Sequence, residues 1–547
     1  MKSVTTLFYV LIFFFIAEIS HSQITTEWTS TYNSVSNGND EVLSMTVDNS
    51  GNVFVTGFSV TTGGDKDIIT VKYNSAGTEQ WATKFNNADV NGDDEGTSID
   101  VDAFGNSYVT GYSTGNGTFK DYVTIKYSSA GNILWTARYN GSGNDDDISS
   151  AIKVTPAGNV YITGSSVGNG SSEDYVTIKY NTSGAQQWVS VYNNDVVNDI
   201  DIANSITIDN SENVYVSGFS YGNSKNEDYA TVKYNSSGAE QWVSRFNGAS
   251  DSFDISEGIA VDNSGNVYVT GYSYDSLSSE DYLTIKYNSS GNEQWISRFN
   301  GTGNSFDITS GIAVDNSGNV FVTGYSYDNS TFEDYATVKY NSDGVQQWVS
   351  EYNGEGSDFD IAVALKLDGS GNVYVTGYSF GNGTAEDYAT VKYNSDGILQ
   401  WTEIYNGSQD GSDVAMALFV DLSGNVYTSG YSYNSATAFD FLTIKYSPTV
   451  GISNVSLSAP DKFELQQNYP NPFNPSTSIN YNLPSDNFVT LKIYDINGKE
   501  AATLVNGRQS RGSYSAKWNA SGFSSGIYFY KLETGKFAET KRMMLIK

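Results

Sequence analysis

The chain has 547 residues, with 53 Gly, 41 Tyr and 9 Trp but only 17% charged residues, which is the composition of a large, turn-rich β protein. Its formal net charge of −33 repels nucleic-acid phosphates and anionic membranes. The composition therefore argues against nucleic acid as a partner and favours cations, basic partners or simple solubility.

The N-terminus, "MKSVTTLFYVLIFFFIAEISHS", places Lys2 before an apolar run and ends in the small-x-small triplet Ser20-His21-Ser22. This pattern predicts a signal peptide at residues 1–22, and its apolar run is too short for a stable membrane span. Cleavage before Gln23 would remove the single histidine, and the chain has no cysteine. The mature protein would then lack a Ser-His-Asp triad, a Cys-His pair, a His- or Cys-ligated zinc site and disulfides.

A repeat of 53 or 54 residues fills most of the chain and is marked by tryptophans at Trp28, Trp81, Trp135, Trp188, Trp242, Trp295, Trp348 and Trp401. In the fifth copy, a run ending at Val261 is followed by strand-like runs at Val267–Tyr272, Tyr282–Tyr287 and Gln294–Phe299. The turn formers "DNSGN" and "NSSG" separate the first two runs and the last two. Four antiparallel strands per period of this size predict a blade of a β-propeller.

The frame of the repeat predicts how the ring closes. The array begins with a Trp strand, Thr26–Tyr32, and ends with a strand of the third type, Phe441–Tyr446. If the Trp strand is outermost, the N-terminal strand completes the last blade. We therefore predict that residues 23–447 form an eight-bladed propeller of four-stranded repeats, clasped by its own two ends.

The composition changes after Tyr446, because six of the seven prolines lie from Pro448 onward. Residues 448–462 read as a linker. Residues 463–547 alternate apolar and polar side chains around Asn-Gly and Thr-Gly turns, which predicts a small Ig-like β-sandwich. The fold class is thus all-β, with two domains.

The motifs "GNVYVTG" and "DYVTIKY", together with the repeated tryptophan, resemble the bacterial β-propeller repeat called SBBP, from Thr26 to Ser447. The name of that family implies seven blades, whereas this chain shows eight copies. The resemblance implies no single activity.

The tail carries "NYPNPFNP" at Asn468–Pro475 and "KRMMLIK" at Lys541–Lys547. With these motifs it resembles the type A C-terminal sorting domain of type IX secretion cargo. The resemblance implies a Gram-negative bacterium, export to the periplasm and passage to the outer cell surface or the medium. It also implies that the type IX secretion machinery is the partner of residues 463–547. The alternative is an Ig-like domain that only binds a ligand.

Two aspartate positions do not vary between copies. One precedes the innermost strand: Asp40, Asp94, Asp147, Asp201, Asp254, Asp307, Asp360 and Asp413. The other opens the third strand: Asp67, Asp121, Asp174, Asp228, Asp281, Asp334, Asp387 and Asp440. We expect both rings on one face. The functional interpretation is that the first ring forms a cation-attracting binding mouth, and the favoured interpretation is that each carboxylate accepts backbone N–H bonds and fastens its blade.

Calcium is the one cofactor that this pattern leaves open, because its ligands are oxygens. The segment Asp89–Gly96, "DVNGDDEG", resembles the start of an EF-hand loop but lacks the Gly required at the sixth position. No metal ligand is therefore assigned.

Two further columns are aligned in the copies. Lysines recur in the third strand, where we expect ion pairs with aspartates rather than catalysis, at Lys72, Lys126, Lys179, Lys233, Lys286, Lys339, Lys392 and Lys445. The innermost strand has a variable column, in which selectivity would reside if the channel binds a ligand: Thr46, Asp100, Lys153, Thr207, Ala260, Ala313, Lys366 and Phe419.

Three functions of different class fit the sequence. We favour an exported, non-enzymatic binding or adhesion module, because an enzyme needs one asymmetric constellation and the strongest patterns here are symmetric. No catalytic residue is assigned. Its extracellular ligand would be a glycan or a protein, and Tyr272 and Tyr274 illustrate side chains that could stack on sugars. The alternatives are a carboxylate-based glycan-active enzyme and a purely structural surface protein.

Overall fold

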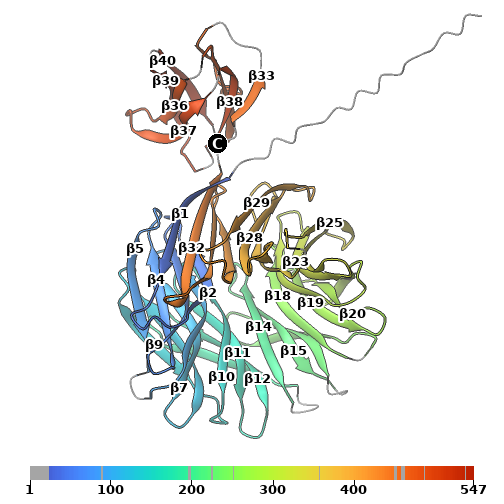
Figure 1. Ribbon diagram of the computed structural model, residues 1–547. Coiled ribbons are helices and arrows are strands. Elements are labelled where there is room, and N and C mark those ends of the chain that lie inside the picture. Colours follow the sequence, from blue (N-terminus) through green and yellow to red (C-terminus); the bar gives the residue numbers. More distant parts are fainter. Residues whose placement is uncertain are drawn as a thin grey trace, which may run out of the picture. The chain divides into compact units, whose positions relative to one another are not determined.

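The computed structural model describes residues 24–547 except 88–89, 195–198, 223–225, 251, 357, 449–451, 457–461, 486, 510, 521, 536 and 547. The predicted signal peptide lies outside the described residues. The chain divides into two compact units, Ile24–Ser447 and residues 448–547 (Figure 1). In the part of the chain that is described, no helix has the length and apolar character needed to cross a membrane.

The first unit contains eight four-stranded antiparallel sheets among the described residues. The innermost strands are β2 (Asp40–Val47), β6 (Asp94–Val101), β10 (Asp147–Val154), β14 (Asp201–Ile208), β18 (Asp254–Val261), β22 (Asp307–Val314), β26 (Asp360–Leu367) and β30 (Asp413–Val420). The second strands are β3 (Val53–Val60), β7 (Ser107–Gly115), β11 (Val160–Val167), β15 (Val214–Tyr221), β19 (Val267–Asp275), β23 (Val320–Asp328), β27 (Val373–Phe380) and β31 (Val426–Asn434).

The third strands are β4 (Lys66–Tyr73), β8 (Phe119–Tyr127), β12 (Glu173–Tyr180), β16 (Glu227–Tyr234), β20 (Ser279–Tyr287), β24 (Phe332–Tyr340), β28 (Glu386–Tyr393) and β32 (Ala438–Pro448). The outer strands are β5 (Glu79–Phe85), β9 (Ile133–Tyr139), β13 (Gln186–Tyr192), β17 (Glu240–Phe246), β21 (Glu293–Phe299), β25 (Gln346–Tyr352), β29 (Leu399–Tyr405) and β1 (Ile24–Tyr32). We number the blades 1 to 8 by their innermost strands, from β2 to β30.

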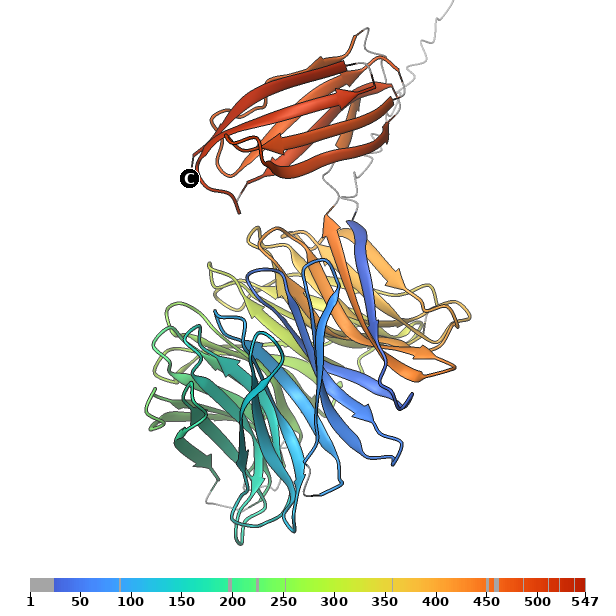
Figure 2. The same cartoon turned by 90° about the vertical axis from the view of Figure 1, so that its left-hand side faces the viewer.

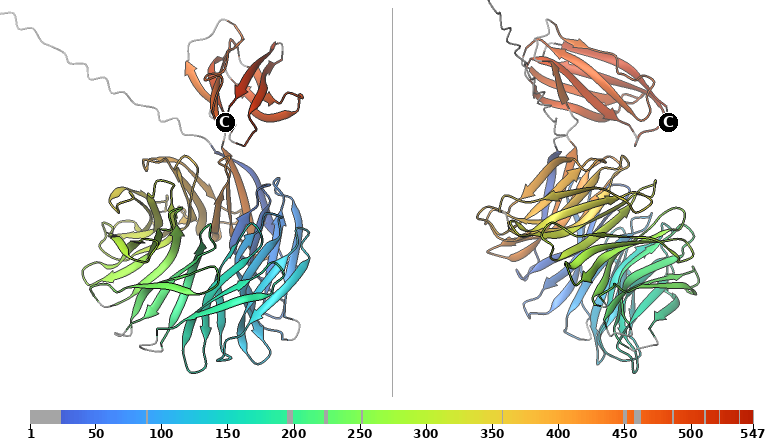
Figure 3. Two further views of the ribbon diagram at one scale, coloured as in Figure 1. Left: turned by 180° about the vertical axis from the view of Figure 1, so that it is seen from behind. Right: turned by 90° about the vertical axis from the view of Figure 1, so that its right-hand side faces the viewer.

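Each innermost strand contacts the innermost strand of the next blade, and β30 contacts β2 to close the circle (Figures 1 and 3). The predicted eight-bladed propeller is therefore confirmed, and the seven blades implied by the family name do not apply. The aligned Trp strands are outermost, as expected.

The clasp is also confirmed. Strand β1 lies at the outer edge of blade 8, hydrogen-bonded to β32. Lys445 and Glu27 form an ion pair of 2.9 Å, and the rings of Tyr32 and Phe441 lie 5.7 Å apart. The first strand of the unit thus completes the last blade.

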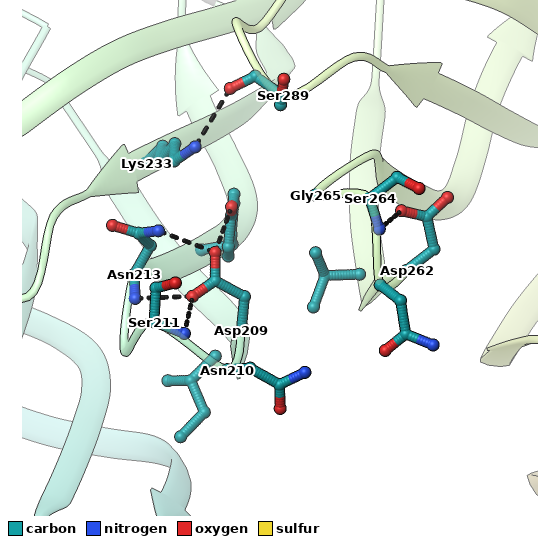
Figure 4. A pocket seen from close by; sticks show the side chains of 13 residues that line it. Asp209, Asn210, Ser211, Asn213, Lys233, Asp262, Ser264, Gly265 and Ser289 are labelled. Carbon is teal, nitrogen blue, oxygen red and sulfur yellow. Dashed lines mark hydrogen bonds between the residues drawn. The ribbon is translucent and has the colours of Figure 1, made fainter.

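The repeated phrase "DNSGN" is a turn held by its own aspartate. The Oδ1 atom of Asp262 accepts hydrogen bonds from the backbone of Ser264 and Asn266, at 2.8 and 2.9 Å, and its Oδ2 atom accepts one from the side chain of Asn266. Gly265 has a φ of 77°, which only glycine adopts without strain. Figure 4 shows this turn and its counterpart at Asp209 in the neighbouring blade. The phrase is therefore a scaffold that sets the register of β18 on β19.

Neighbouring blades are joined at one carbonyl. The Ser289 oxygen of blade 5 accepts a hydrogen bond from Trp242 Nε1 of blade 4, at 3.2 Å. It accepts a second one from Lys233 Nζ of the same blade, at 3.0 Å (Figure 4). The same ammonium lies 5.0 Å from the Tyr215 ring centroid, a cation–π contact. A Cβ atom added to Gly291 would lie 2.6 Å from the Trp242 ring, so only glycine permits this approach.

These contacts between neighbouring blades differ from the expectation that the eight aligned lysines form ion pairs with aspartates. Each of their ammonium groups lies over an aromatic ring of the second strand, at 4.7 to 5.5 Å. Within the described ranges, only Lys126, Lys179 and Lys445 also form ion pairs within 4.0 Å. Of the remaining ammonium groups, those of Lys72, Lys233, Lys286 and Lys339 also donate to the carbonyl of the next blade.

The described residues of the second unit form two four-stranded sheets, in the orders β33-β38-β35-β34 and β37-β36-β39-β40 (Figure 2). The strands are β33 (Ile452–Ser456), β34 (Glu464–Leu465), β35 (Ser476–Leu483), β36 (Asn487–Tyr494), β37 (Glu500–Gln509), β38 (Gly512–Asn519), β39 (Gly526–Thr534) and β40 (Phe537–Leu545). One apolar core, which includes Ile479, Leu491, Trp518 and Leu532, joins both sheets.

One segment differs from the predicted linker at residues 448–462. Strand β33 falls within that range and pairs with β38 as an edge strand. The physical reason is that the edge of β38 offers backbone donors and acceptors that a passing chain can satisfy.

Candidate functional site

The first aspartate ring is buried rather than solvent-facing. Its eight side chains, Asp40, Asp94, Asp147, Asp201, Asp254, Asp307, Asp360 and Asp413, are at most 1% exposed. Each Oδ2 atom accepts a backbone N–H from the preceding loop, as Asp254 does from Gly248 at 2.6 Å. In the register, Asp254 stands opposite Ser273 of the next strand. In this arrangement each carboxylate holds the loop that leads into its own blade, as the fastening interpretation predicts.

The blade encloses these carboxylates, as the favoured fastening interpretation requires. Burial raises the pKa of all eight, and it raises the pKa of Asp201, Asp254 and Asp307 to about 6. A binding role for this ring remains a prediction, and its burial gives that role no support.

We expect this ring to make the propeller more stable at pH 5.0 than at pH 7.5. A carboxyl whose pKa is higher in the folded state favours folding below its unfolded pKa of about 3.9, and that contribution is lost as the pH rises through about 6. Carboxyls with lowered pKa, such as Asp262 and Glu212, act in the opposite direction only below about pH 4.

Thermal melts of mature Gln23–Lys547, followed by tryptophan fluorescence, should give a midpoint lower at pH 7.5 by about 5 °C. Asp254→Asn removes one ionising group and should reduce the difference between the unfolding midpoints at pH 5.0 and pH 7.5. A midpoint that rises between pH 5.0 and 7.5 would contradict the assignment.

The second aspartate ring is buried too, but its partners differ between blades. A basic side chain from the outer strand pairs with it in four blades, at 2.7 to 3.2 Å: Lys84 with Asp67, Arg138 with Asp121, Arg245 with Asp228 and Arg298 with Asp281. In blade 6 the corresponding outer-strand residue is Glu351, which stands opposite Ala336. Burial, with Asp360 and Glu351 nearby, raises the pKa of Asp334 to about 6. Blades 3 and 7 hold Val191 and Ile404 at the position of Glu351, so several blades lack the basic partner and blade 6 has a second carboxylate in its place.

The described residues do not offer a fitted calcium site. They contain no group of three or more His, Cys, Asp or Glu side chains placed to hold a metal ion. The buried carboxylates already accept hydrogen bonds from backbone N–H groups, from basic side chains or from hydroxyl groups, as Asp174 does from Ser171. In the EF-hand-like segment, Asp89 lies outside the described residues. Calcium binding remains a prediction that no contact supports.

Aromatic side chains also depart from the repeat pattern, in blades 6 and 7. We call Phe306, Tyr327, Phe332, Phe359 and Phe380 the aromatic row. Successive ring centroids along it lie 5.3, 6.4, 5.9 and 6.0 Å apart, so the row runs continuously through blades 6 and 7. Phe332 and Phe359 are 47% and 42% exposed. The row therefore offers aromatic faces to solvent.

The backbone positions the row at the connections between strands. Phe306 and Phe359 directly precede the innermost strands β22 and β26, and their carbonyls accept the N–H groups of Tyr327 and Phe380, each at 3.3 Å. Phe332 opens β24 with a φ of 65°. A bulky side chain is strained in this left-handed region, which glycine favours. The turn alone would favour glycine at this position, so the exposed Phe332 side chain is not explained by the backbone of the turn.

Carboxylates lie around the row. Burial, with Asp358 nearby, raises the pKa of Glu333. On the exposed side, the hydroxyl of Thr302 donates to Asp328 at 2.6 Å. The surface is therefore mixed, with aromatic faces beside carboxylate and hydroxyl groups.

The sequence reasoning found this row only in part. The expected stacking position of Tyr274 recurs as Tyr327 and Phe380, which belong to the row. The reasoning missed the other three members of the row. The signal that could have found the row is the residue before the invariant aspartate, which is Phe only at Phe253, Phe306 and Phe359.

The geometry defines a protein of two β units, an eight-bladed propeller and a tail with a core of its own. Residues 80–117, 241–277 and 294–330 match the Beta-propeller repeat SBBP, and residues 467–547 match the Secretion system C-terminal sorting domain. The chain thus carries SBBP propeller repeats and a type IX secretion tail, and it is a secreted protein, exported to the cell surface or beyond it.

Other similarities are distant. An uncharacterized WD repeat-containing protein of Acanthamoeba polyphaga mimivirus is 28% identical over 31% of this chain and 13% of its own length. PorZ, a surface component of the type IX secretion system of Porphyromonas gingivalis, is 13% identical, with a TM-score of 0.38 over 92% of this chain and 66% of PorZ. A β-xylosidase/α-arabinofuranosidase from a compost metagenome is 12% identical, with a TM-score of 0.24 over 44% of this chain and 89% of that chain.

The chain therefore spans a small part of the curated relative and just under two thirds of PorZ. At these TM-scores the likenesses carry no argument about function.

Proposed function

We propose that the exported propeller is a non-enzymatic binding module that holds a glycan on the aromatic row. The observation that carries this proposal is the continuous row of five rings, two of them exposed, in a ring of blades that is otherwise closely repetitive. Exposed aromatic groups that depart from the scaffold pattern indicate a binding surface.

A glycan suits the chemistry of this surface. The electron-rich face of an aromatic ring attracts the polarised C–H groups on one face of a pyranose, while carboxylates accept hydrogen bonds from its hydroxyls. Phe332 and Phe359 come from adjacent blades and are inclined by 35°, so one glycan can contact both rings. Asp328, which stands opposite Phe332 in the same hairpin, places a carboxylate beside the row.

We expect Phe332→Gly to weaken glycan binding about tenfold, which corresponds to about 1.4 kcal/mol, while leaving the fold intact. Glycine relaxes the left-handed backbone, so a loss of binding would come from the ring itself. Phe119→Gly is the matched control, because Phe119 occupies the same position in blade 2, with a φ of 59° and an exposure of 63%, but lies outside the row.

The measurement is a glycan array with mature protein, followed by titration of the best ligand with both variants. Equal losses from the two variants, or no glycan bound, would refute the proposal. Binding of a basic peptide in place of glycans would show that the row recognises a protein partner.

The enzymatic alternative has one specific candidate. Glu257, on innermost strand β18, has a pKa raised to about 7 by burial, which suits a general acid. If the protein cleaves glycans, Glu257→Gln should abolish product formation in a chromatographic assay. Binding without cleavage in the parent protein would favour the binding module, and silence in every assay would favour a structural role.

A further inference from the structure

The variable column of the innermost strands forms one tier around the propeller axis. These residues, the second-last of each innermost strand, are Thr46, Asp100, Lys153, Thr207, Ala260, Ala313, Lys366 and Phe419. Innermost strands of neighbouring blades contact one another in a closed circle (Figure 1), so these positions all lie on the strands nearest the propeller axis. The charges of Lys153, Lys366 and Asp100 act on one another although they belong to separate blades, which indicates that these side chains point toward the axis. We call this column the channel tier.

Two lysines of this tier lie on opposite sides of the channel. Lys153 belongs to blade 3 and Lys366 to blade 7, four blades apart in a ring of eight. Both side chains are exposed to solvent, and Asp100 of blade 2 is half-buried. Lys366 is close enough to feel the charges of both Lys153 and Asp100. The channel tier therefore gathers three charges from three different blades.

Neither ammonium group makes a hydrogen bond or a salt bridge in the described part of the chain, although the Asp100 carboxylate attracts both through space. The salt bridges and hydrogen bonds found there include none from the Nζ atom of Lys153 or Lys366. The carboxylate of Asp100 instead accepts the backbone N–H groups of Val101 and Val154, both at 2.8 Å. With two lysines and one aspartate, the channel tier carries a charge of +1 while the chain carries −33.

This arrangement is unfavourable for the protein alone. Desolvation within the ring of strands, followed by repulsion from Lys153, lowers the pKa of Lys366 to about 8. The fold does not require lysine here, because blades 5 and 6 hold Ala260 and Ala313 at the same position. A negatively charged ligand would supply the missing partner.

We propose that the channel tier binds a small oxyanion, a carboxylate or phosphate group, between the ammonium groups of Lys153 and Lys366. Charge-assisted hydrogen bonds from the two Nζ atoms would hold its oxygens, and the hydroxyls of Thr46 and Thr207 lie in the same tier. The acidic exterior opposes this only weakly, since salt screens exposed charges beyond about 8 Å. The site is separate from the aromatic row and goes beyond the glycan proposal.

The test is calorimetric titration of mature protein with sodium phosphate and, separately, sodium acetate, at constant ionic strength in chloride. We expect saturable binding of one ion per chain, weakened at least tenfold by Lys153→Thr and by Lys366→Thr. Threonine already occupies this tier in blades 1 and 4, so the variants should fold, and a melt checks that they do. Lys517→Gln, which removes an exposed tail lysine, should change nothing.

Asp100→Asn gives an independent readout, because removing the negative charge should tighten anion binding. Binding of phosphate alone would identify a phosphate site, and binding of acetate alone would identify a carboxylate site. Absence of saturable binding by either anion, or equal binding in both threonine variants, would overturn the proposal. Phe332→Gly should leave anion binding unchanged, so the two proposals can fail separately.

Discussion

Deleting residues 23–32 will destabilise the whole propeller by about 5 kcal/mol or more, a large share of the 5 to 15 kcal/mol typical of folded proteins. Strand β1 completes blade 8 and also joins it to blade 1. Trp28 Nε1 donates to the Ser75 carbonyl at 3.1 Å, and the hydroxyl of Ser30 donates to the Gly77 carbonyl at 2.6 Å. Each lost hydrogen bond costs about 1 kcal/mol, and lost burial of a tryptophan adds several more.

Urea unfolding of the mature chain with and without this strand, followed by tryptophan fluorescence, measures the loss. A synthetic peptide of residues 23–33 added in trans should restore the midpoint, whereas the same peptide carrying Trp28→Ala should not. Unchanged stability after the deletion would show that the ring does not depend on its clasp.

The second large effect concerns export. Removing Phe463–Lys547 should leave a folded propeller inside the cell envelope and abolish its appearance at the surface or in the medium. The reason is that the tail has its own apolar core and matches a secretion sorting domain, while the propeller core clusters are composed of propeller residues alone.

Immunoblots of periplasm, surface and medium give the measurement. The tail fused to an inert exported reporter is the positive control, and it should carry the reporter to the surface. Truncated protein outside the cell at an unchanged level would contradict the role assigned to residues 463–547.

The propeller could be predicted because the residues that determine its strands and turns recur at a fixed spacing in the sequence. The tryptophan spacing determines the blade length, Asn and Gly place the hairpin turns, and the incomplete copies at the two ends predict the clasp. These signals depend on neighbours in sequence and on a regular repeat. The chain's own pattern also gave the correct number of blades where the family name implied seven.

The chemistry at blade surfaces was harder to predict. The aspartate at Asp254 reads as an exposed ligand or as a buried fastening, because its exposure depends on how the preceding loop covers it. The aligned Lys233 has a partner in the next blade, at Ser289, more than fifty residues away. The aromatic row arises from irregular residues between copies, such as Phe306, which an argument built on invariant positions passes over.

The clasp also has a consequence for the order of events during synthesis. The hydroxyl of Thr25 and the carbonyl of Ser447, 3.5 Å apart, are separated by 422 positions along the chain, so their contact carries the largest loop-closure entropy in the propeller. Until the last blade has been made, β1 has no partner strand and an incomplete chain has an open sheet edge. Such edges invite pairing with other chains. Closure of the ring by its two ends therefore distinguishes complete from incomplete chains, since a prematurely terminated chain keeps an unpaired strand edge.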